Sequence, residues 1–358
     1  MIVKNESHVI RESLTCVLPL IDTYCIVDTG STDDTIQVIR TFFAEKDILG
    51  EVHERPWKDF GTNRSEALAL CDGKMDYILV IDADDLMTFP SNGRELLDEV
   101  LSDNPSNVMV EIRMSNLRYR RTQIFKANDG WKYVGVLHEY ATNYKVCRTV
   151  YLQNFQMQGR HLGGRHIGGD VRIQDIAVLE KGLLDEPKNE RYMFYLAQTY
   201  RDSHNVEKAV EWYTKRFEFG GWFEEVYVSG VNITRLTNSK EWAWKTHETN
   251  PKRIECLFCY MAHCRATNKW SQELYAMAKY AVSIPMPTDQ LLFVESDVYE
   301  WKVWDEFSII AYYTGHYQEA YDAGMLLLEN PKLPESQRHR IVANSEFSYT
   351  KISKFHPS

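Results

Sequence analysis

Short apolar runs alternate with stretches of helical periodicity over the first 85 residues. The runs that we expect to form strands lie at residues 2–3, 24–27, 51–54 and 77–81. Between them, apolar side chains recur every three or four positions, which predicts helices. We expect these helices to open at Asn5 or Ser7, at Thr32 or Asp33, and at Asn63. Because strands and helices alternate, this part should form an open α/β domain with a mostly parallel sheet.

The pattern changes after the fourth run. Phe89-Pro90 interrupts it, and a helix is expected over residues 94–101. Four further runs have the character of antiparallel strands, at residues 108–114, 119–125, 133–136 and 150–156. From Val171 onward the pattern is helical throughout. We therefore expect two domains, formed by residues 1–170 and residues 171–358.

The second half carries small residues at the spacing of a helical repeat. Ala197 and Ala209 are placed as in the helix pair of a tetratricopeptide repeat, where small side chains let two helices approach closely. Degenerate copies of this pattern follow near Ala262 and Ala320, at intervals longer than the usual ~34 residues. The pattern predicts an all-α tetratricopeptide-like solenoid of about three irregular repeats.

The apolar run at residues 77–81 ends at three carboxylates, Asp82, Asp84 and Asp85. Buried parallel strands commonly carry ligands at their carboxyl ends. Neighbouring carboxylates repel one another unless a cation or hydrogen-bond donors compensate them. The cluster therefore predicts a metal–diphosphate site, and the alternative is a solvated acidic turn.

Asp28 ends the run at residues 24–27 in the same way. A carboxylate at that point can accept hydrogen bonds from a base or a ribose. The alternative is that Val27-Asp28-Thr29-Gly30-Ser31-Thr32-Asp33 supplies only a glycine turn and a helix N-cap.

Composition narrows the class of protein. The formal net charge of −10 argues against a general nucleic-acid binder. Seven cysteines, an odd number without a disulfide-scaffold spacing, suggest a reducing compartment, and we expect a cytoplasmic protein. No apolar stretch approaches a membrane-spanning length, and the start MIVKNESHVIRES is too charged for a secretory signal.

Four motifs carry a resemblance to a known family. MIVKNES, IVDTGSTDDT, the Asn-Arg of GTNRSEAL and ILVIDADD, in this order and spacing, resemble family 2 glycosyltransferases of the GT-A fold. The resemblance covers residues 1–170 and implies transfer of a sugar from a nucleotide diphosphate, with UDP-sugar as the expected donor. It also implies inversion at the sugar and a divalent cation, Mn²⁺ or Mg²⁺, whose preference for oxygen ligands suits the acid cluster.

The resemblance assigns roles to matching residues. Asp28 would bind the nucleobase, Asp33 would lie near the nucleoside or cap the helix, and Arg64 would face the uracil or the diphosphate. The donor side would also include three residues of MIVKNES, namely Val3, Asn5 and Glu6.

Within the acid cluster, Asp82 and Asp84 form the DxD pair of the resemblance. Asp82 would face the ribose or the sugar and share in the metal site, and Asp84 would bind the metal. Asp85 would be a second metal ligand or a catalytic-site group that holds the donor sugar.

The stretch WKYVGVLHEY resembles the "W…GxxHE" element of the branch that carries helical repeats, which FYLAQTYRD and FGGWFEE also match. An inverting mechanism needs one group to take the acceptor's proton. Glu139 is the first choice for this base and His138 the second, with orientation of the acceptor or the metal as its other role. The alternative is that both residues only hydrogen-bond a loop at a strand end.

The glycine-rich stretch at residues 159–170 is suited to a loop that closes on a diphosphate, with Arg165 as a donor-binding residue. His161 or His166 would then complete the metal shell. The competing interpretation is a plain linker. A second set, Cys256, Cys259, His263 and Cys264, has the look of a zinc site, but its spacing also makes one stripe of a helix.

The sequence therefore predicts a metal-dependent glycosyltransferase that acts on a protein, a peptide or a glycan. The helical domain would bind this acceptor or form a homodimer. The rival hypothesis is a scaffold whose transferase domain has lost catalysis. A nucleotidyltransferase of the same fold would need a glycine-rich signature near the first strand, which MIVKNES lacks.

Overall fold

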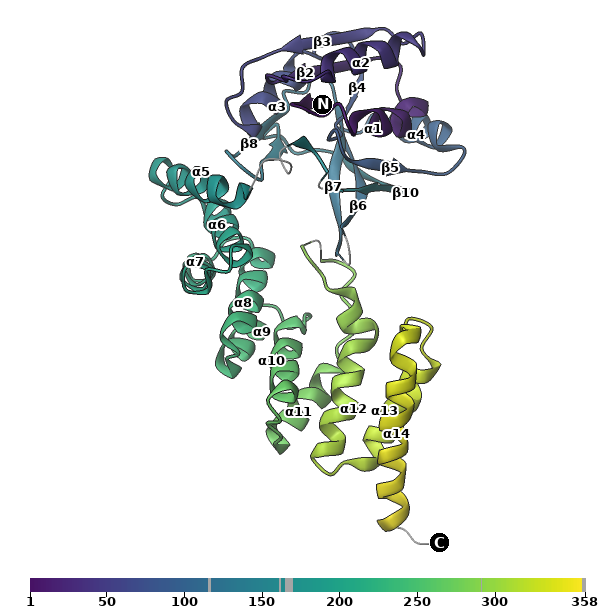
Figure 1. Cartoon of the computed structure of the whole chain (residues 1–358), viewed down its shortest axis with the longest axis vertical. Coiled ribbons are helices and arrows are strands. Elements are labelled where there is room, and N and C mark those ends of the chain that lie inside the picture. Colours follow the sequence, from purple (N-terminus) through teal and green to yellow (C-terminus); the bar gives the residue numbers. More distant parts are fainter. Residues whose placement is uncertain (115–116, 161, 165–169, 291, 356–358) are drawn as a thin grey trace. The chain divides into compact units, whose positions relative to one another are not determined.

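The computed structural model describes residues 1–114, 117–160, 162–164, 170–290 and 292–355 (Figure 1). The chain divides into two compact units, Met1–Thr199 and Tyr200–Ser358. Each unit has its own core and is described by itself.

The first unit contains all the strands of the described chain. They are β1 (Ile2–Val3), β2 (Tyr24–Asp28), β3 (Gly50–Glu54), β4 (Tyr77–Leu79), β5 (Leu86–Thr88), β6 (Asn107–Met114), β7 (Leu117–Lys126), β8 (Lys132–Val134), β9 (Tyr140–Thr142) and β10 (Thr149–Gln158). Its helices are α1 (Ile10–Val17), a 3₁₀ turn (Leu18–Leu20), α2 (Thr35–Ala44), α3 (Phe60–Ala69), α4 (Gly93–Ser102), α5 (Val171–Asp185) and most of α6 (Glu190–Asp202).

Strands β1, β2 and β3 form a parallel sheet, as the alternation of strands and helices predicts. Its register pairs Val3 with Asp28 and Asp28 with Glu54, so the carboxyl ends of the three strands meet at one edge. A second sheet has the order β4-β7-β6-β10-β5, and β8 pairs with β9. The predicted α/β class of the GT-A type is confirmed for this unit.

The second sheet departs from the predicted antiparallel series at one pair. Strands β6 and β7 are antiparallel, as expected, whereas β10 runs parallel to β6. The chain leaves the sheet after β7 and forms the β8–β9 hairpin before β10 returns. A long connection of this kind permits a parallel pairing that neighbouring strands joined by a tight turn cannot adopt.

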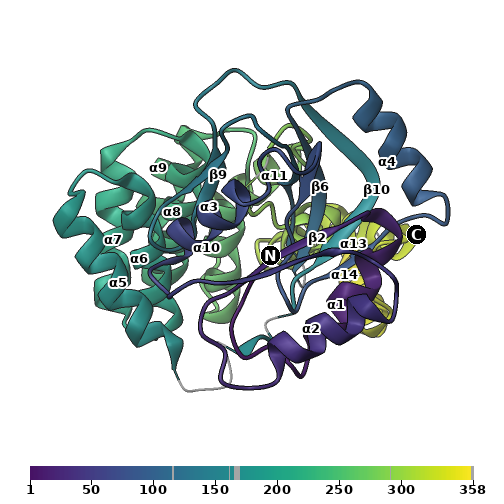
Figure 2. The ribbon, with the colours of Figure 1, turned by 90° about the horizontal axis from the view of Figure 1, so that it is seen from above.

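Apolar faces of the helices bury both sheets. Helices α1 and α2 lie side by side (Figure 2), and Ile10 of α1 and Ile39 of α2 are fully buried. Tyr24 of β2 stacks on Phe43 of α2 with ring centroids 3.8 Å apart. Helix α4 lies beside β10, over a core that includes Phe155.

The first helix begins later than predicted, at Ile10 rather than at Asn5 or Ser7. The backbone N–H groups of Asn5, Glu6 and Ser7 donate instead to side chains of the β2–α2 loop. These hydrogen bonds bind residues 5–7 to the start of α2, and the chain turns there before α1 begins.

A cavity of about 980 Å³ lies within the first unit, lined by residues of β1, β2, β4 and their helices. Arg64 is the one predicted site residue among the described residues that lines it. The cavity therefore does not coincide with the predicted donor site.

Helices α5 and α6 belong mainly to the first unit, although the predicted boundary falls just before α5. The N–H of Val136 donates to the Tyr192 hydroxyl at 3.2 Å, and Arg191 Nε donates to the carbonyl of His138 at 2.8 Å. These contacts tie α6 to the β8–β9 hairpin and explain why the compact units divide at Thr199.

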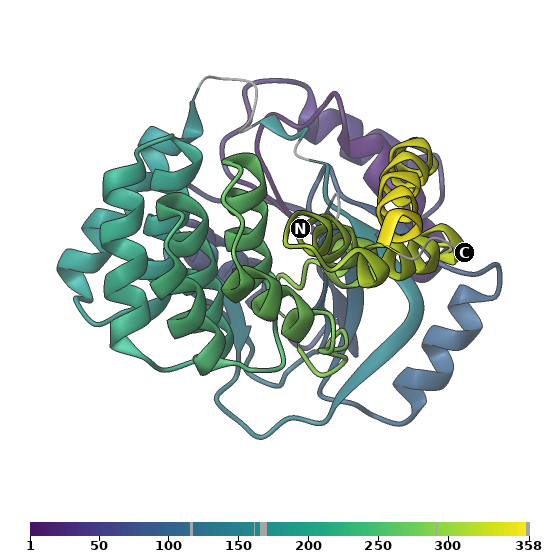
Figure 3. The same ribbon diagram turned by 90° about the horizontal axis from the view of Figure 1, so that it is seen from below.

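The second unit is helical. Its elements after α6 are α7 (Val206–Phe219), α8 (Phe223–Thr237), α9 (Lys240–Thr249), α10 (Glu255–Ala266), α11 (Gln272–Ala281), a π-helical turn (Val298–Lys302), α12 (Val303–Tyr313), α13 (Tyr317–Glu329) and α14 (Glu335–Phe355). Each helix packs against the next along the chain, as the succession of colours in Figure 3 shows. A helical C-terminal domain is thus confirmed.

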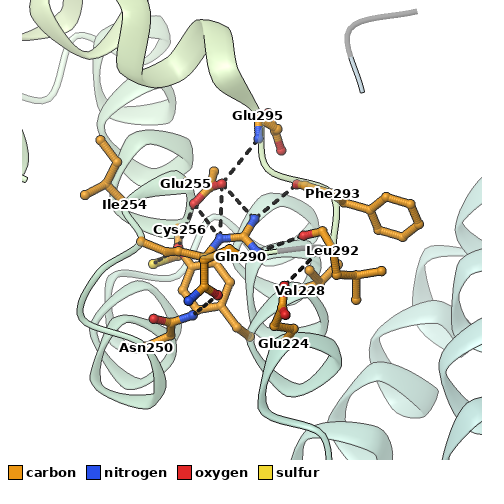
Figure 4. A network of polar contacts seen from close by, with 12 residues as sticks. Glu224, Val228, Asn250, Ile254, Glu255, Cys256, Gln290, Leu292, Phe293 and Glu295 are labelled. Atoms are coloured by element: carbon orange, nitrogen blue, oxygen red, sulfur yellow. Dashed lines mark hydrogen bonds and ion pairs between the residues drawn. The ribbon is translucent and has the colours of Figure 1, made fainter. Parts of the chain in front are cut away.

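A buried ion pair fixes the long connection between α11 and α12 (Figure 4). Arg253 and Glu255 are each 1% exposed and lie 2.7 Å apart. The Arg253 guanidinium also donates to the carbonyls of Leu292 and Phe293, and the N–H of Glu295 donates to Glu255. The ion pair therefore holds this connection against α10.

Glu255 is fully satisfied by its neighbours. The hydroxyls of Tyr227 and Tyr299 donate to its Oε2 at 3.1 and 2.8 Å. Burial alone would raise the pKa of Glu255, but the Arg253 guanidinium and these hydrogen bonds hold it below its ordinary value. The carboxylate is therefore ionised inside the helical unit.

The cysteines of the second unit lie on α10, where Cys256 and Cys264 are buried. Across the described part of the chain, no group of three or more His, Cys, Asp or Glu side chains is arranged to hold a metal ion. No described helix has both the length and the apolar character needed to cross a membrane.

We expect Glu255→Gln to loosen the connection between α11 and α12. Removing one charge of a buried pair leaves the other uncompensated, which costs about 3–5 kcal/mol. Deuterium uptake over residues 292–295 should rise. Glu211→Gln, which removes an exposed carboxylate paired with Lys208 and Lys215, is the control and should change stability by only ~0–1 kcal/mol. Unchanged uptake in Glu255→Gln would contradict the anchoring role.

Candidate active site

Asp28 ends β2 with its side chain almost out of solvent, at 2% exposure. Its Oδ1 accepts hydrogen bonds from the N–H groups of Gly30 and Ser31 at 2.9 and 2.8 Å. Its Oδ2 is buried and has no hydrogen-bond partner among the described residues. A buried, unpaired carboxylate oxygen is costly, so a ligand that donates hydrogen bonds to it would be favoured.

The residues of MIVKNES form hydrogen bonds with the β2–α2 loop. Asn5 adopts a left-handed backbone with φ of 57°, and its Oδ1 accepts from the N–H of Thr32 at 2.7 Å. The carbonyl of Val3 accepts from the N–H of Thr29 at 2.9 Å. Val3 therefore lies beside Asp28 and Asn5 beside the loop that follows it, and their predicted role in donor binding stays a prediction.

Asp33 has a structural task in this arrangement. Its carboxylate accepts from the N–H groups of Ser7 and Thr35 at 3.2 and 3.1 Å. Burial opposes ionisation, but these hydrogen bonds lower the pKa of Asp33 to about 2. Asp34 is the N-cap residue of α2, and Asp33, one residue earlier, binds the first amide of the helix, while its predicted place near the nucleoside stays a prediction.

The acid cluster follows β4, which ends at Leu79, two residues before the predicted end. The carbonyl of Val80 accepts from the Gln123 side chain at 3.0 Å. The N–H of Asp85 donates to the carbonyl of Asp82 at 3.2 Å, which forms a turn. The carboxylates of Asp82, Asp84 and Asp85 therefore project from one short turn in different directions, and each contacts different partners.

Arg64 lies between Asp82 and Glu139. Its Nη2 donates to Asp82 Oδ1 at 2.6 Å, and its Nε lies 2.6 Å from Glu139 Oε1. Its side chain is 14% exposed and its guanidinium lies 5.7 Å from the centre of the Tyr133 ring. Burial would lower the pKa of Arg64, but the two carboxylates raise it well above its ordinary value.

The two residues of the Asn-Arg motif, Asn63 and Arg64, lie on different faces of α3 and make different contacts. Asn63 is buried and binds the preceding loop, accepting from the N–H of Lys58 and donating to the carbonyl of Pro56. Arg64 faces the acids. Burial would raise the pKa of Asp82, but the Arg64 guanidinium holds it below its ordinary value.

Close packing of α3 on the β8–β9 hairpin brings Glu139 to Arg64. The N–H of Tyr133 donates to Ser65 Oγ at 2.8 Å. A Cβ on Gly61 would lie 2.5 Å from the carbonyl oxygen of Gly135, so only glycine fits there. This contact joins motifs that lie far apart in the sequence.

Asp85 is 7% exposed, and its Oδ2 lies 3.8 Å from Arg121 Nη2. Burial and the nearby Asp82 carboxylate raise the pKa of Asp85 to about 7, although Arg121 opposes the shift. Asp85 is thus a buried acid behind the DxD pair, and its predicted role at the donor sugar or the metal stays a prediction.

The segment after β10 covers Asp84. The N–H groups of Leu162 and Gly163 donate to Asp84 Oδ2 at 2.7 and 3.0 Å, and Arg160 Nε donates to its carbonyl at 2.7 Å. The N–H of Gly164 donates to Glu6 Oε2 at 3.1 Å. Part of the glycine-rich stretch therefore lies over the acid cluster.

Glu6 and Asp84 lie close to each other beneath this segment. A Cβ on Gly163 would contact both carboxylates, at 3.2 Å from Glu6 and 3.6 Å from Asp84. Burial raises the pKa of Glu6 to about 7, and Asp84 adds to the shift. His161, Arg165 and His166 lie outside the described residues, so their predicted roles stay predictions.

The donor chemistry around Asp84 fits a hard divalent cation. Mg²⁺ and related ions are often held by one or two carboxylates together with substrate phosphates, so a set of three protein ligands is not required. Asp84 now satisfies its charge with backbone N–H groups, which stand where a cation would compete. Asp82 is engaged by Arg64, so Asp84 is the better candidate ligand.

His138 and Glu139 point to different neighbours. The His138 ring stacks on Tyr195 of α6 at 3.8 Å, and its backbone has φ of 53°. The Glu139 side chain is 11% exposed and faces Arg64. Of the two candidate bases, Glu139 is the one joined to the DxD turn through Arg64.

Several residues around the site were not predicted. Arg191 and Tyr195 support His138 from α6, and Arg160 and Arg121 contact the acid cluster. The matching stretch FYLAQTYRD contains Tyr195 and gave a signal for it. Arg160 lies in the glycine-rich stretch that was expected to close on a diphosphate, although Arg165 was the residue selected from it. Arg121 lies in β7, where no local sequence pattern indicates a contact with the DxD turn.

Parts of the chain are similar to known glycosyltransferases. Residues 1–159 match the family described as Glycosyl transferase family 2. SPbeta prophage-derived glycosyltransferase SunS of Bacillus subtilis (strain 168) is 25% identical over 229 residues, which are 60% of this chain and 51% of SunS. Uncharacterized glycosyltransferase RP128 of Rickettsia prowazekii (strain Madrid E) is 33% identical over 100 residues, 28% of this chain and 30% of RP128. The chain spans about half, or less, of the length of these relatives.

Two solved structures are also similar. S. aureus TarS 1-349 in complex with UDP-GlcNAc has 14% sequence identity and a TM-score of 0.33, covering 78% of this chain and 88% of that one. A thermophilic TPR protein of Thermus thermophilus, TTC0263, has 13% identity and a TM-score of 0.29, covering 47% of this chain and 88% of that one. These TM-scores are too low to establish a shared fold.

The fold and the acids at its strand ends define an α/β domain of the GT-A class. More particularly, residues 1–159 match the glycosyl transferase family 2 model, so this part of the chain is similar to the domains of that family.

We expect Gly164→Ala to lift the covering segment from Asp84. A Cβ at Gly164 would lie 2.5 Å from the carbonyl oxygen of Asn5, which is backbone and cannot move aside easily. Deuterium uptake at the Leu162 amide should therefore increase. Gly163→Ala is the matched control, since its Cβ meets only flexible carboxylates and should have a smaller effect. Equal uptake in wild type and Gly164→Ala would contradict the described cover.

Proposed function

We propose that this chain is a metal-dependent, inverting glycosyltransferase that takes a sugar from a UDP-sugar donor. The observation that carries the proposal is the buried, unpaired Oδ2 of Asp28 at the end of β2. A uracil N–H is a suitable donor for that oxygen. Glu6, which follows β1 in the same sheet, lies close to Asp84 of the acid cluster. The family match and the glycosyltransferase relatives support the same class of reaction.

The chain's own residues divide the work. Asp28 binds the base, Asp82 faces the ribose or the sugar, and Asp84, with Asp82 or Glu6 near it, holds Mn²⁺ or Mg²⁺. The bound metal neutralises charge on the diphosphate leaving group. A nucleophilic group of the acceptor bonds to the anomeric carbon while the bond from that carbon to the diphosphate oxygen breaks.

Glu139 receives the proton that the acceptor group loses, and the nucleoside diphosphate leaves with the electron pair of the broken bond. The Arg64 guanidinium lies 2.6 Å from Glu139 and holds its carboxylate next to the DxD turn. His138 stacks on Tyr195 and, in this proposal, orients the acceptor.

The acceptor is proposed to be a protein, a peptide or a glycan, bound by the helical unit as a tetratricopeptide-like solenoid. Small residues at the predicted repeat positions support this: Ala197, Ala209 and Ala320 are buried, and Ala262 is half-buried. The same unit is the candidate surface for a homodimer. A cytoplasmic location is consistent with seven cysteines that are all free.

The rival proposal is a catalytically inactive scaffold. It would require that the acids serve only the fold. Asp33, Arg160 and the segment over Asp84 show that part of the constellation does stabilise structure. The unpaired Oδ2 of Asp28 does not stabilise the fold in this way, and this favours the enzyme over the scaffold.

We expect Asp84→Asn and Glu139→Gln to separate donor binding from chemistry. A thermal-shift titration with UDP-sugars should raise the melting temperature of the wild type more with Mn²⁺ than without it, since a ligand at 100 Kd adds ~2.7 kcal/mol. Asp84→Asn should lose the Mn²⁺-dependent part. Glu139→Gln should still bind the donor but release sugar from it about 10²–10⁴-fold more slowly.

Asp98→Asn is the control, because Asp98 is an exposed partner of Arg94 on α4 and carries the same charge as Asp84. It should behave as the wild type in both assays. No stabilisation of the wild type by any UDP-sugar with Mn²⁺ would support the scaffold instead.

A further inference from the structure

One guanidinium serves two carboxylates that the proposed reaction uses at different moments. Arg64 contacts Asp82 on the donor side and Glu139, the candidate base, at 2.6 Å each. The three side chains are mostly withdrawn from solvent, with 14%, 33% and 11% exposure for Arg64, Asp82 and Glu139. One positive charge is thus divided between two negative charges.

The two contacts differ in kind. Arg64 Nη2 makes an aligned hydrogen bond to Asp82. Arg64 Nε lies as close to Glu139, yet its N–H is not aligned well enough for a hydrogen bond with any acceptor in the described part of the chain. The attraction to Glu139 is therefore electrostatic and weakly directional, so a better acceptor can displace it.

Arg64 is not needed to fasten α3 to the β8–β9 hairpin. Ser65 and Tyr133 exchange hydrogen bonds at 2.8 and 3.2 Å, and Gly61 packs directly on Gly135. The frame around Arg64 therefore has its own contacts, and the guanidinium can change partners without the frame opening.

We propose that Arg64 is a positioning residue that links donor binding to the release of Glu139. In the free chain Arg64 holds Glu139. A diphosphate bound next to Asp82 competes for the guanidinium, because oxygens of a diphosphate match its planar set of donors. Arg64 turns toward the donor, and Glu139 becomes free to act as a base once the donor is in place. The inference rests on the proposed function.

The consequence is a coupling whose sign a purely structural role does not predict. If Glu139 and the diphosphate compete for Arg64, removing the charge of Glu139 must tighten diphosphate binding. The gain must vanish when Arg64 is also removed. A Glu139 that only stabilises the fold would weaken binding when changed, with or without Arg64.

The test is a double-mutant cycle measured by calorimetric titration of UDP in the presence of Mn²⁺. The variants are Glu139→Gln, Arg64→Gln and the two together in the full chain. Glu139→Gln is expected to bind UDP roughly three- to tenfold more tightly than the wild type, as a coupling between contacting charges allows. In the Arg64→Gln background the same change should alter the affinity by less than about twofold.

Two further variants serve as controls for this double-mutant cycle. Arg64→Lys keeps a cation in case Arg64→Gln folds poorly, and adding Glu139→Gln to it should again tighten UDP binding. Asp98→Asn removes one exposed carboxylate from the same unit and should leave the affinity within about twofold, because its charge is screened.

The outcomes separate the two proposals. If the wild type binds UDP but Glu139→Gln binds equally or more weakly, the coupling through Arg64 is overturned and the proposed function stands. If the tightening persists in the Arg64→Gln background, Arg64 is not the shared group. If the wild type does not bind UDP, the proposed function itself is overturned, and the coupling with it.

Discussion

Carboxylates held at the strand ends of a sheet need positive partners, and this need organises the first unit. Asp28 accepts from two loop N–H groups, Asp82 takes the Arg64 guanidinium, and Asp84 takes the amides of a segment 78 to 79 residues away. Each partner comes from a different element, so compensation of charge also assembles the site. The carboxylate oxygen left unpaired among the described residues, Asp28 Oδ2, marks where a ligand completes it.

The same physical rule operates in the helical unit with the opposite result. Arg253 and Glu255 are almost completely buried, and surrounding hydroxyl and backbone groups satisfy them. This pair fixes a connection and leaves no unmet charge for a ligand. In the first unit the carboxylates are held by groups that a nucleotide or a cation can replace. This difference distinguishes a binding site from an ion pair that only stabilises the fold.

Local pattern was enough to predict most elements and the placement of acids at strand ends. The strands β2, β3 and β4 and the domains' classes follow from periodicity, because each depends on residues close in sequence. Contacts between residues far apart in the sequence could not be predicted from local pattern. The late start of α1, the parallel pairing of β6 with β10, and the division of the compact units at Thr199 all depend on such contacts. The contacts of Arg64 and Asp33 were likewise decided by partners that only the fold supplies.

The central claim is that the strand ends that carry Asp28 and Asp84 bind a nucleotide diphosphate, which draws Arg64 toward it. A crystal structure of the chain with UDP and Mn²⁺ tests this most directly. The account predicts the uracil against Asp28 Oδ2, the metal on Asp84, the segment at Leu162 and Gly163 displaced from that carboxylate, and Arg64 turned from Glu139 to the diphosphate. A nucleotide bound away from Asp28, or Arg64 still paired with Glu139 beside a bound diphosphate, would contradict it.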